Sequence, residues 1–280
     1  IYEKREFKKL AYKIAEYSAN YLYDTYSFYQ NTELELGFGD WMSKNYPDHD
    51  FYCDIYEDIS HEYELMKESY GYINFNDLLI KTRNLLSAEI FVNFQEVLVD
   101  EYQDTNSLQG SLIDKMNPTS LFCVGDYDQS IFAFNGANIN LIGSFSGKFP
   151  GAKVFSLKKN YRSTALILAL ADRVIKFNDR IYPKELMVVR KDDPINPSLL
   201  EFNELFEQYS KVSHMIKVNS SHYDDVAVIF RNNSSADGIE ASLRELGIPC
   251  KRKGGKSFFD AKEVKILFDM YAFFVNPKDM

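Results

Sequence analysis

The chain has 280 residues, enough for about two domains, and its 45% hydrophobic and 26% charged residues are ordinary for a globular protein. Its net charge of −9 argues against a nucleic-acid binder that works by charge alone, although a local basic groove stays compatible with it. No apolar run approaches the ~18 residues that cross a bilayer, no signal peptide is recognisable, and three dispersed cysteines favour a reducing, cytoplasmic location. The first residue is Ile1 rather than Met, so we expect a piece of a longer protein.

The first 72 residues are expected to be helical. Apolar side chains recur at helical spacing through residues 1–30, an acidic segment broken by glycine and proline follows, and a further helix is expected over residues 55–69. We interpret residues 1–72 as a helical subdomain.

After this subdomain, helices alternate with strands. A helix is expected near residues 75–85, and another begins at Thr105 or Asn106. Three apolar runs are expected to form buried strands: residues 97–99, 121–124 and 154–157. This alternation predicts an α/β fold with a mainly parallel sheet.

The last part of the chain continues the alternation. A helix is expected from Ser163 or Thr164 to about residue 176, followed by a loop or linker over residues 182–197, which contain three prolines. Further elements are expected beyond it: strands over residues 199–202 and 226–230, a helix over residues 236–246 that stops at Gly247, and a final helix from a capping box at Asp260 and Glu263 to about Phe274.

Two adjacent carboxylates, Asp100 and Glu101, follow the first expected strand directly. In open α/β sheets, ligands bind just beyond the carboxyl ends of the strands. Phosphoryl transfer needs a carboxylate that holds Mg²⁺ and a group that orients the attacking water, and Asp100 and Glu101 suit these two tasks. The alternative is a solvated pair of acids at the start of a loop.

Polar and aromatic residues follow the next two expected strands. Gln129 could hydrogen-bond a γ-phosphate or the attacking water without adding charge, and Phe132 and Phe134 could stack on unpaired bases or pack in the core. Arg162 could bind phosphate as an arginine finger or form a structural ion pair, and the neighbouring Tyr161 could stack on a purine or belong to the core.

Together these segments resemble the UvrD/Rep/PcrA family of superfamily 1 DNA helicases. The match lies in DEYQDTN at residues 100–106, VGDYDQSIFAFNGA at residues 124–137 and NYRS at residues 160–163, which are similar to the family's motifs II, III and IV. The resemblance implies partial RecA-like domains of the P-loop NTPase type with a helical N-terminal subdomain. It implies three parts: residues 1–72 as the helical insertion (1B-like), residues 73–157 as the C-terminal part of the first RecA-like domain (1A-like), and residues 158–280 as the N-terminal part of the second (2A-like).

The resemblance also implies roles for individual residues. Asp100 would ligate Mg²⁺, Glu101 would act as the base toward the hydrolytic water, Gln129 would sense the γ-phosphate of ATP, Arg162 would be the arginine finger and Tyr161 would stack on adenine. The expected DNA contacts are Phe132, Phe134, Arg231 and Lys256. Phe134 stands where the family usually has a base-stacking Trp, and Asn135 replaces the family's usual Arg.

The family's phosphate-binding loop, Gly-x-x-x-x-Gly-Lys-Ser/Thr, is absent from this sequence. Residues 254–257 read GGKS, but Cys250 occupies the place of the first glycine, and the segment follows a helix far beyond the acidic pair. With three basic residues at 251–253, this turn is either a DNA-backbone contact or a solvated basic loop.

The resemblance therefore implies part of an ATP-dependent 3′–5′ DNA helicase that uses ATP and Mg²⁺ and acts on single-stranded DNA and duplex junctions, with no membrane partner. Without a phosphate loop, the chain by itself is expected not to hydrolyse ATP. Two alternatives stay open: a subunit of a helicase–nuclease of the RecB or AddA type, and a non-catalytic scaffold with the helicase fold.

Overall fold

The computed structural model describes residues 2–33, 35–88, 94–191, 195–220, 222–254 and 262–275. The chain forms two compact units, Ile1–Asn196 and Pro197–Met280. The family resemblance implies a different division, into three parts with boundaries after residues 72 and 157. That division stays a prediction.

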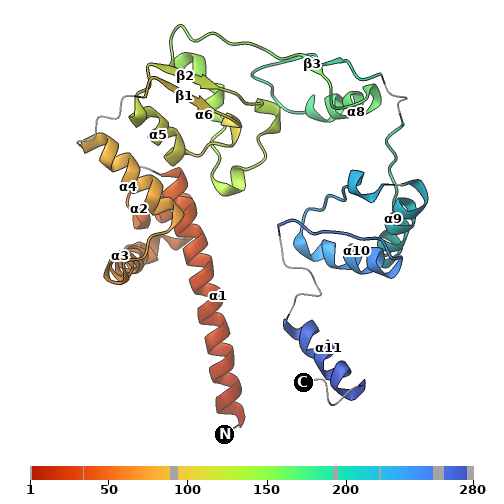
Figure 1. Ribbon diagram of the computed structural model, residues 1–280. Coiled ribbons are helices and arrows are strands. Elements are labelled where there is room, and N and C mark those ends of the chain that lie inside the picture. The colour runs from red at the N-terminus through yellow and green to blue at the C-terminus, as the bar shows by residue number, and fades with distance from the viewer. Residues whose placement is uncertain are drawn as a thin grey trace. The chain divides into compact units, whose positions relative to one another are not determined.

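The first unit begins with helices, as the sequence predicts (Figure 1). A mainly aromatic cluster lies among them: Phe38, Trp41 and Met42 are buried and pack against the half-buried Tyr26, Phe28, Tyr29, Leu36 and Tyr56. The helices are α1 (Tyr2–Thr32), α2 (Phe38–Asn45), α3 (Cys53–Tyr70) and α4 (Phe75–Ala88), with a 3-10 turn at Pro47–Tyr52. The predicted helices near residues 1–30, 55–69 and 75–85 are therefore confirmed.

Two strands of this unit form a small parallel sheet. Strand β1 (Glu96–Val99) pairs with β2 (Ser120–Cys123), with Val97 opposite Leu121. Helix α5 (Ser107–Met116) connects them. It begins with a capping box, in which Asn106 Oδ1 accepts from the Gln109 amide at 2.8 Å and the Gln109 side chain accepts from the Asn106 amide at 3.1 Å. The predicted helix start at Asn106 is confirmed.

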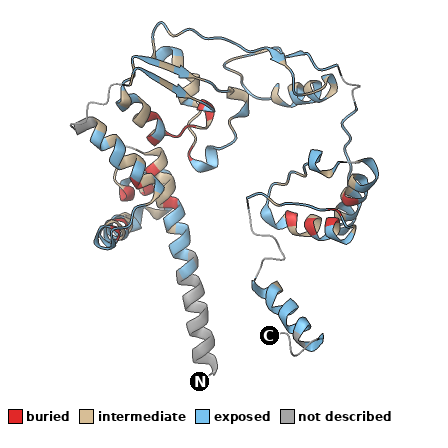
Figure 2. Cartoon of the chain, in the orientation of Figure 1, coloured by how far each residue is buried: buried red, intermediate tan, exposed pale blue. Residues whose placement is uncertain are grey.

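The expectation that these strands are buried is wrong for one of the two sheet faces. Val97 and Val99 are half-buried, but Leu98 is 74% exposed and Phe122 is 56% exposed. Side chains of a strand point alternately to opposite faces, and only one face of this sheet is covered by the described residues (Figure 2).

The third predicted strand, over residues 154–157, is also not formed. This stretch has no strand assignment, and three of its side chains are more than 60% exposed. A segment becomes a strand only when its amide and carbonyl groups pair with a neighbour. The pairing lies a few residues later: β3 (Lys159–Asn160) runs parallel to β4 (Met187–Val188), so the segment predicted as a loop over residues 182–197 contains a short strand.

Three further helices are found among the described residues of the first unit. They are α6 (Asn140–Gly143), α7 (Phe145–Lys148) and α8 (Ala165–Ile175). Helix α8 begins after Thr164 and ends at residue 175, within one residue of its predicted end.

The second unit contains α9 (Leu205–Asn219), α10 (Asn233–Glu245) and α11 (Lys262–Val275). Helix α10 packs closely on α9 where Gly238 of α10 meets the ring of Tyr209 of α9. Any side chain at this position would clash, since a Cβ atom at Gly238 would lie only 2.0 Å from the ring. The predicted helix near residues 236–246 is confirmed, and Gly247 follows it with a φ of 72°. The strands predicted over residues 199–202 and 226–230 are wrong, because these segments pair with no described neighbour. Helix α11 confirms the final helix, whereas Asp260 of its predicted capping box lies outside the described residues.

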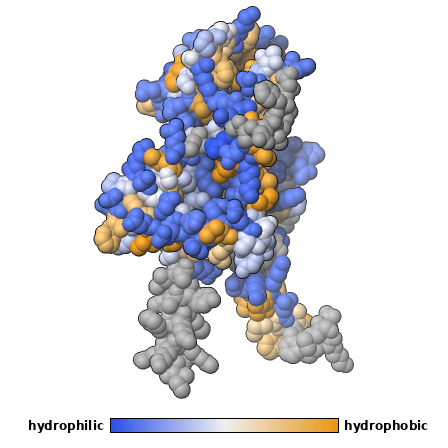
Figure 3. Space-filling model, turned by 90° about the vertical axis from the view of Figure 1, so that its left-hand side faces the viewer, coloured by the Kyte–Doolittle hydropathy of each residue, from blue (hydrophilic) through white to orange (hydrophobic). Residues whose placement is uncertain are grey.

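Helices alternating with small parallel sheets confirm the α/β fold class and are consistent with a partial RecA-like fold. Hydrophobic side chains reach the surface in patches between hydrophilic ones (Figure 3). Within the described parts of the chain, none of the helices has the length and apolarity that a membrane span requires.

Candidate functional site

Two loops leave the same edge of the β1–β2 sheet. Because the strands are parallel and in register, Asp100 directly follows one strand where Val124 follows the other. The Val124 amide donates to the Val99 carbonyl at 2.8 Å, and the Tyr102 amide donates to the Val124 carbonyl at 2.9 Å. These backbone bonds hold the loop after β1 against the loop after β2.

Glu101 lies in the left-handed backbone region, with a φ of 50° and a ψ of 43°. Its amide donates to Asp100 Oδ1 at 2.9 Å, and both acids are exposed. A non-glycine residue in this conformation costs roughly 1–3 kcal/mol and is typical of functional sites. The sharp turn directs the two adjacent carboxylates into solvent at the sheet edge.

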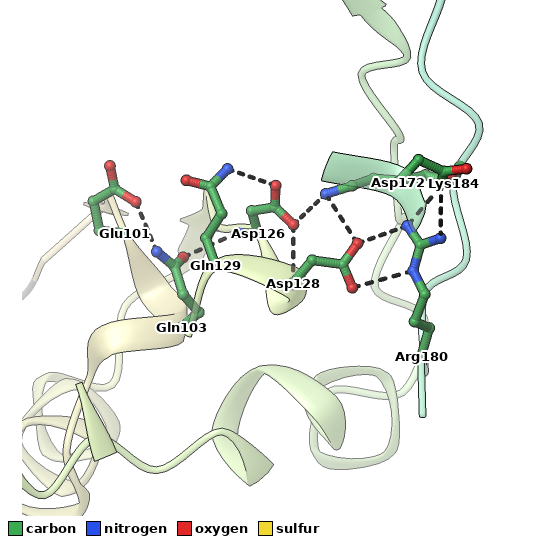
Figure 4. A network of polar contacts seen from close by, with 8 residues as sticks. All are labelled: Glu101, Gln103, Asp126, Asp128, Gln129, Asp172, Arg180 and Lys184. Carbon is green, nitrogen blue, oxygen red and sulfur yellow. Dashed lines mark hydrogen bonds and ion pairs between the residues drawn. The ribbon is translucent and has the colours of Figure 1, made fainter. Parts of the chain in front are cut away.

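Gln103 connects the two loops through a buried side-chain amide (Figure 4). Only 1% of this residue is exposed. Its Nε2 donates to Glu101 Oε2 at 2.8 Å, and its Oε1 accepts from the Asp126 amide at 2.9 Å. Because a buried amide must satisfy both its donor and its acceptor, Gln103 fixes the Glu101 carboxylate relative to the loop after β2.

Asp126 holds the predicted phosphate sensor. Gln129 Nε2 donates to Asp126 Oδ2 at 2.7 Å, and the Asp128 amide donates to Asp126 Oδ1 at 3.1 Å. Burial disfavours the charged carboxylate, but hydrogen bonds from Lys184 and Gln129 outweigh it and lower the pKa of Asp126 below its usual value. Asp126 is therefore an anion that orients the Gln129 amide.

Two basic residues that lie later in the chain bind the aspartates of this loop (Figure 4). Arg180 contacts Asp128 with two nitrogens, Nη2 to Oδ2 at 2.6 Å and Nε to Oδ1 at 3.3 Å. Lys184 donates to Asp126, and its Nζ lies 3.7 Å from Asp128 Oδ2. The side chains of Arg180 and Asp128 are only 14% and 11% exposed, so these ion pairs are partly shielded from water.

Four residues, Asp100, Glu101, Gln129 and Arg162, have catalytic roles by the family resemblance, and the first three lie on the β1–β2 edge. Glu101 and Gln129 join the same hydrogen-bond network, and Asp100 is adjacent to it. Arg162 is exposed; its backbone amide donates to Asn160 Oδ1 at 3.0 Å, and its carbonyl accepts from Arg190 Nη1 at 2.8 Å. Within the described residues its guanidinium contacts none of the other three. The neighbouring Tyr161 is 67% exposed rather than part of the core.

Phe132 and Phe134 lie on the loop that follows Gln129. Their ring centroids are 5.8 Å apart, and the residues are 40% and 71% exposed. The Asn138 amide donates to the Thr105 carbonyl at 2.9 Å, which ties this loop to the start of α5. Phe134 therefore has a free surface on which a planar group can stack.

The other two predicted DNA contacts lie later in the chain. Arg231 is exposed just before α10, and Lys256 lies outside the described residues.

The acids at the β1 end suit Mg²⁺ better than a metal that needs a cage of protein ligands. Within the described ranges, no three His, Cys, Asp or Glu residues are arranged to hold a metal. Mg²⁺ is commonly held by one or two carboxylates, with water and substrate phosphates as the other ligands. Asp100, which is exposed and follows β1 directly, fits this pattern.

The second unit has a cavity of its own. It has a volume of about 570 Å³ and is lined by residues of α10 and of the segments around residues 223–230 and 248–253. Its lining includes Lys251, Arg252 and Lys253 of the basic turn, for which the sequence leaves a DNA-backbone contact open, but none of the residues assigned to ATP.

Sequence reasoning missed the roles of Gln103, Arg180 and Lys184. Gln103 lies inside the segment that resembles motif II, so its position was a usable signal. Lys184 lies in the segment predicted as a loop, and Arg180 lies just before it. A single basic residue in such a segment gives no local signal of a functional role.

The comparisons with known proteins agree with the family resemblance of the sequence. Residues 3–150 match the model of the UvrD/REP helicase N-terminal domain, and residues 155–280 match that of the UvrD-like helicase C-terminal domain. The chain is similar to the ATP-dependent DNA helicase PcrA of Staphylococcus epidermidis, with 32% identity over 82% of this chain and 33% of that protein. It is 33% identical to PcrA of Bacillus subtilis over 82% of this chain and 32% of that protein. The chain thus spans about a third of the length of these relatives.

Proposed function

This chain belongs to the UvrD/REP helicase family, and on that premise we propose that it is part of an ATP-dependent DNA helicase. The enzyme would couple ATP hydrolysis to 3′–5′ movement along single-stranded DNA and to the unwinding of duplex at junctions, in the cytoplasm.

One observation carries the proposal. Hydrogen bonds link the Glu101 carboxylate through Gln103 and Asp126 to the Gln129 amide, beyond the ends of two parallel strands. Phosphoryl transfer to water requires such a pair: a base for the water, and a neutral donor that contacts the γ-phosphate.

Each residue has a task in this scheme. Asp100 would hold Mg²⁺, which neutralises charge on phosphate oxygens when bound. Glu101 would orient the attacking water and accept its proton, and Gln129 would donate its amide hydrogen bond toward the γ-phosphate. By resemblance to the family, Arg162 would supply positive charge to the same phosphate, and Tyr161 would stack on adenine.

DNA would contact the exposed aromatic side chains. Phe134, with its partner Phe132, offers a stacking surface next to the residues assigned to ATP. Arg231 and Lys256 would contact the phosphate backbone of the strand. Bases would be held and released in step with the nucleotide cycle.

The chain of 280 residues would not hydrolyse ATP by itself. Its sequence has no Gly-x-x-x-x-Gly-Lys-Ser/Thr loop, whose backbone amides and lysine hold the β- and γ-phosphates. A steady-state ATPase assay of this chain with saturating single-stranded DNA tests the point, and turnover equal to that of the full-length protein would contradict it.

The decisive variant is Glu101→Gln in the full-length protein. Because the amide cannot accept the proton, DNA-stimulated ATP hydrolysis should fall by about 10²- to 10⁴-fold, while binding of a fluorescent ATP analogue persists. Glu96→Gln changes an exposed glutamate at the start of β1, the strand that precedes Glu101; it is the matched control and should leave hydrolysis unchanged. Normal hydrolysis by the Glu101→Gln protein would remove this residue from its proposed role.

A further inference from the structure

The loop after β2 is bound by residues from the other family-matched region. Asp126 and Asp128 belong to the region that matches the helicase N-terminal domain, whereas Arg180 and Lys184 belong to the region that matches the C-terminal domain. Four side chains, Asp126, Asp128, Arg180 and Lys184, form what we call the ion-pair clamp (Figure 4).

The clamp is built to hold a fixed geometry. The guanidinium of Arg180 grips both oxygens of Asp128, and its Nη1 also lies 3.8 Å from Asp172 on α8. Two-pronged contacts of this kind fix orientation as well as distance. Because the side chains of Arg180, Asp128 and Lys184 are 14%, 11% and 18% exposed, removing either cation would leave a carboxylate poorly solvated.

Two contacts of Asp126 connect the ion-pair clamp to Gln129 and Glu101, the residues assigned to hydrolysis. The carboxylate of Asp126 is shared: one oxygen accepts from Lys184 and the other from Gln129. The backbone amide of the same residue donates to Gln103, which in turn donates to Glu101. Asp126 is thus hydrogen-bonded directly to Gln129 and, through Gln103, to Glu101.

We propose that Arg180 and Lys184 are positioning residues, and that the ion-pair clamp sets the orientation of Gln129 and Glu101 from the C-terminal helicase region. The inference rests on the proposed function, because it assigns a regulator to the same hydrolytic site. Movement of the segment that carries Arg180 and Lys184 would then change the rate of hydrolysis without any contact between this segment and the nucleotide.

The test compares three variants of the full-length protein: Lys184→Ala, Lys184→Arg and the control Lys148→Ala. Lys148 also pairs with an aspartate of the first unit, Asp114 at 2.5 Å, but it does not contact the clamp. Because misplaced catalytic groups slow chemistry, Lys184→Ala should lower kcat of DNA-stimulated ATP hydrolysis on the order of 10- to 100-fold and leave KM for ATP nearly unchanged. Lys184→Arg keeps the cation and should recover most of kcat, and Lys148→Ala should resemble the unmodified protein.

Hydrogen–deuterium exchange gives a readout that does not depend on activity. Peptides that cover residues 125–130 should exchange faster in Lys184→Ala than in Lys148→Ala, since the Asp126 and Asp128 amides lose a fixed acceptor geometry. If the unmodified protein does not hydrolyse ATP, the proposed function fails, yet the exchange result still tests the clamp. Unchanged exchange together with unchanged kcat in Lys184→Ala would overturn the clamp while leaving the proposed function intact.

Discussion

Lys67 Nζ lies 2.8 Å from Asp77 Oδ1 and 2.9 Å from Asp77 Oδ2, and the two residues are only 7% and 6% exposed. The pair joins α3 to α4 in the helical part of the first unit. Lys67 also contacts Glu64 at 2.8 Å, and Asp77 accepts from the Asn74 amide at 2.8 Å. Burial disfavours the charged ammonium group, but the hydrogen bonds that Lys67 donates to Asp77 and Glu64 outweigh this effect and raise the pKa of Lys67.

Removing this buried cation should destabilise the first unit strongly. We expect Lys67→Ala to cost about 3–5 kcal/mol, because Asp77 would be left as a buried charge without its main partner. The exposed pair offers the control: Lys148→Ala breaks a contact whose side chains are 35% and 39% exposed and should cost under about 1 kcal/mol. Urea unfolding followed by circular dichroism measures both, and equal costs would contradict the assignment.

The thiol of Cys123 should react slowly. Burial raises its pKa to about 11, and the thiolate is the form that attacks alkylating reagents. At pH 8, iodoacetamide should therefore label Cys123 later than Cys250, which is exposed. Mass spectrometry of tryptic peptides over a time course checks this order, and labelling of Cys123 at the faster rate would show that the thiol is accessible and ionised.

The same pKa shift predicts a loss of stability in alkali. A group whose pKa is raised in the folded state contributes stability below its unfolded pKa, and this contribution is lost as the pH rises through the folded value. Burial also raises the pKa of Tyr102 to about 12. The free energy of unfolding should therefore fall between about pH 9 and pH 12, and Cys123→Ser should reduce the Cys123 part of this fall.

Phe134 should contribute directly to the affinity for single-stranded DNA. Stacking of a base on an aromatic ring is worth roughly 1–3 kcal/mol, so Phe134→Ala in the full-length protein should weaken binding by about 5- to 150-fold. Phe134→Trp offers a larger ring and should bind more tightly. Fluorescence anisotropy with a labelled oligonucleotide measures these changes. Phe177→Ala removes another exposed phenylalanine, 91% exposed, and should have little effect.

Helices were predictable because their signals are local. Asn106 and Gln109 are three residues apart and cap α5 through each other, and Gly247 follows α10 in the left-handed conformation. The strand expected over residues 154–157 failed for the opposite reason. Its apolar residues favour a strand, but whether a strand forms depends on a partner that lies elsewhere in the chain, and β3 finds that partner at β4 instead.

The same distinction divides the candidate site. Asp100 and Glu101 were predictable because they come directly after an apolar run, and Gln129 because it lies in the polar loop that follows the next run. Arg180 and Lys184 were not, since they are separated from their aspartates by 52 and 58 residues, and nothing in the intervening sequence indicates that the segments meet. Arg162 shows the converse: its motif is recognisable, yet its guanidinium contacts none of the other predicted catalytic residues.

The register of β1 against β2 has a consequence for how this chain tolerates change. A strand advances about 3.3 Å per residue and turns each successive side chain to the opposite face. Losing one residue between Leu121 and Cys123 would shift the loop after β2 and pull Asp126 out of reach of Gln103. Homologous sequences should thus vary freely in which apolar residue occupies β2, while insertions and deletions are excluded there.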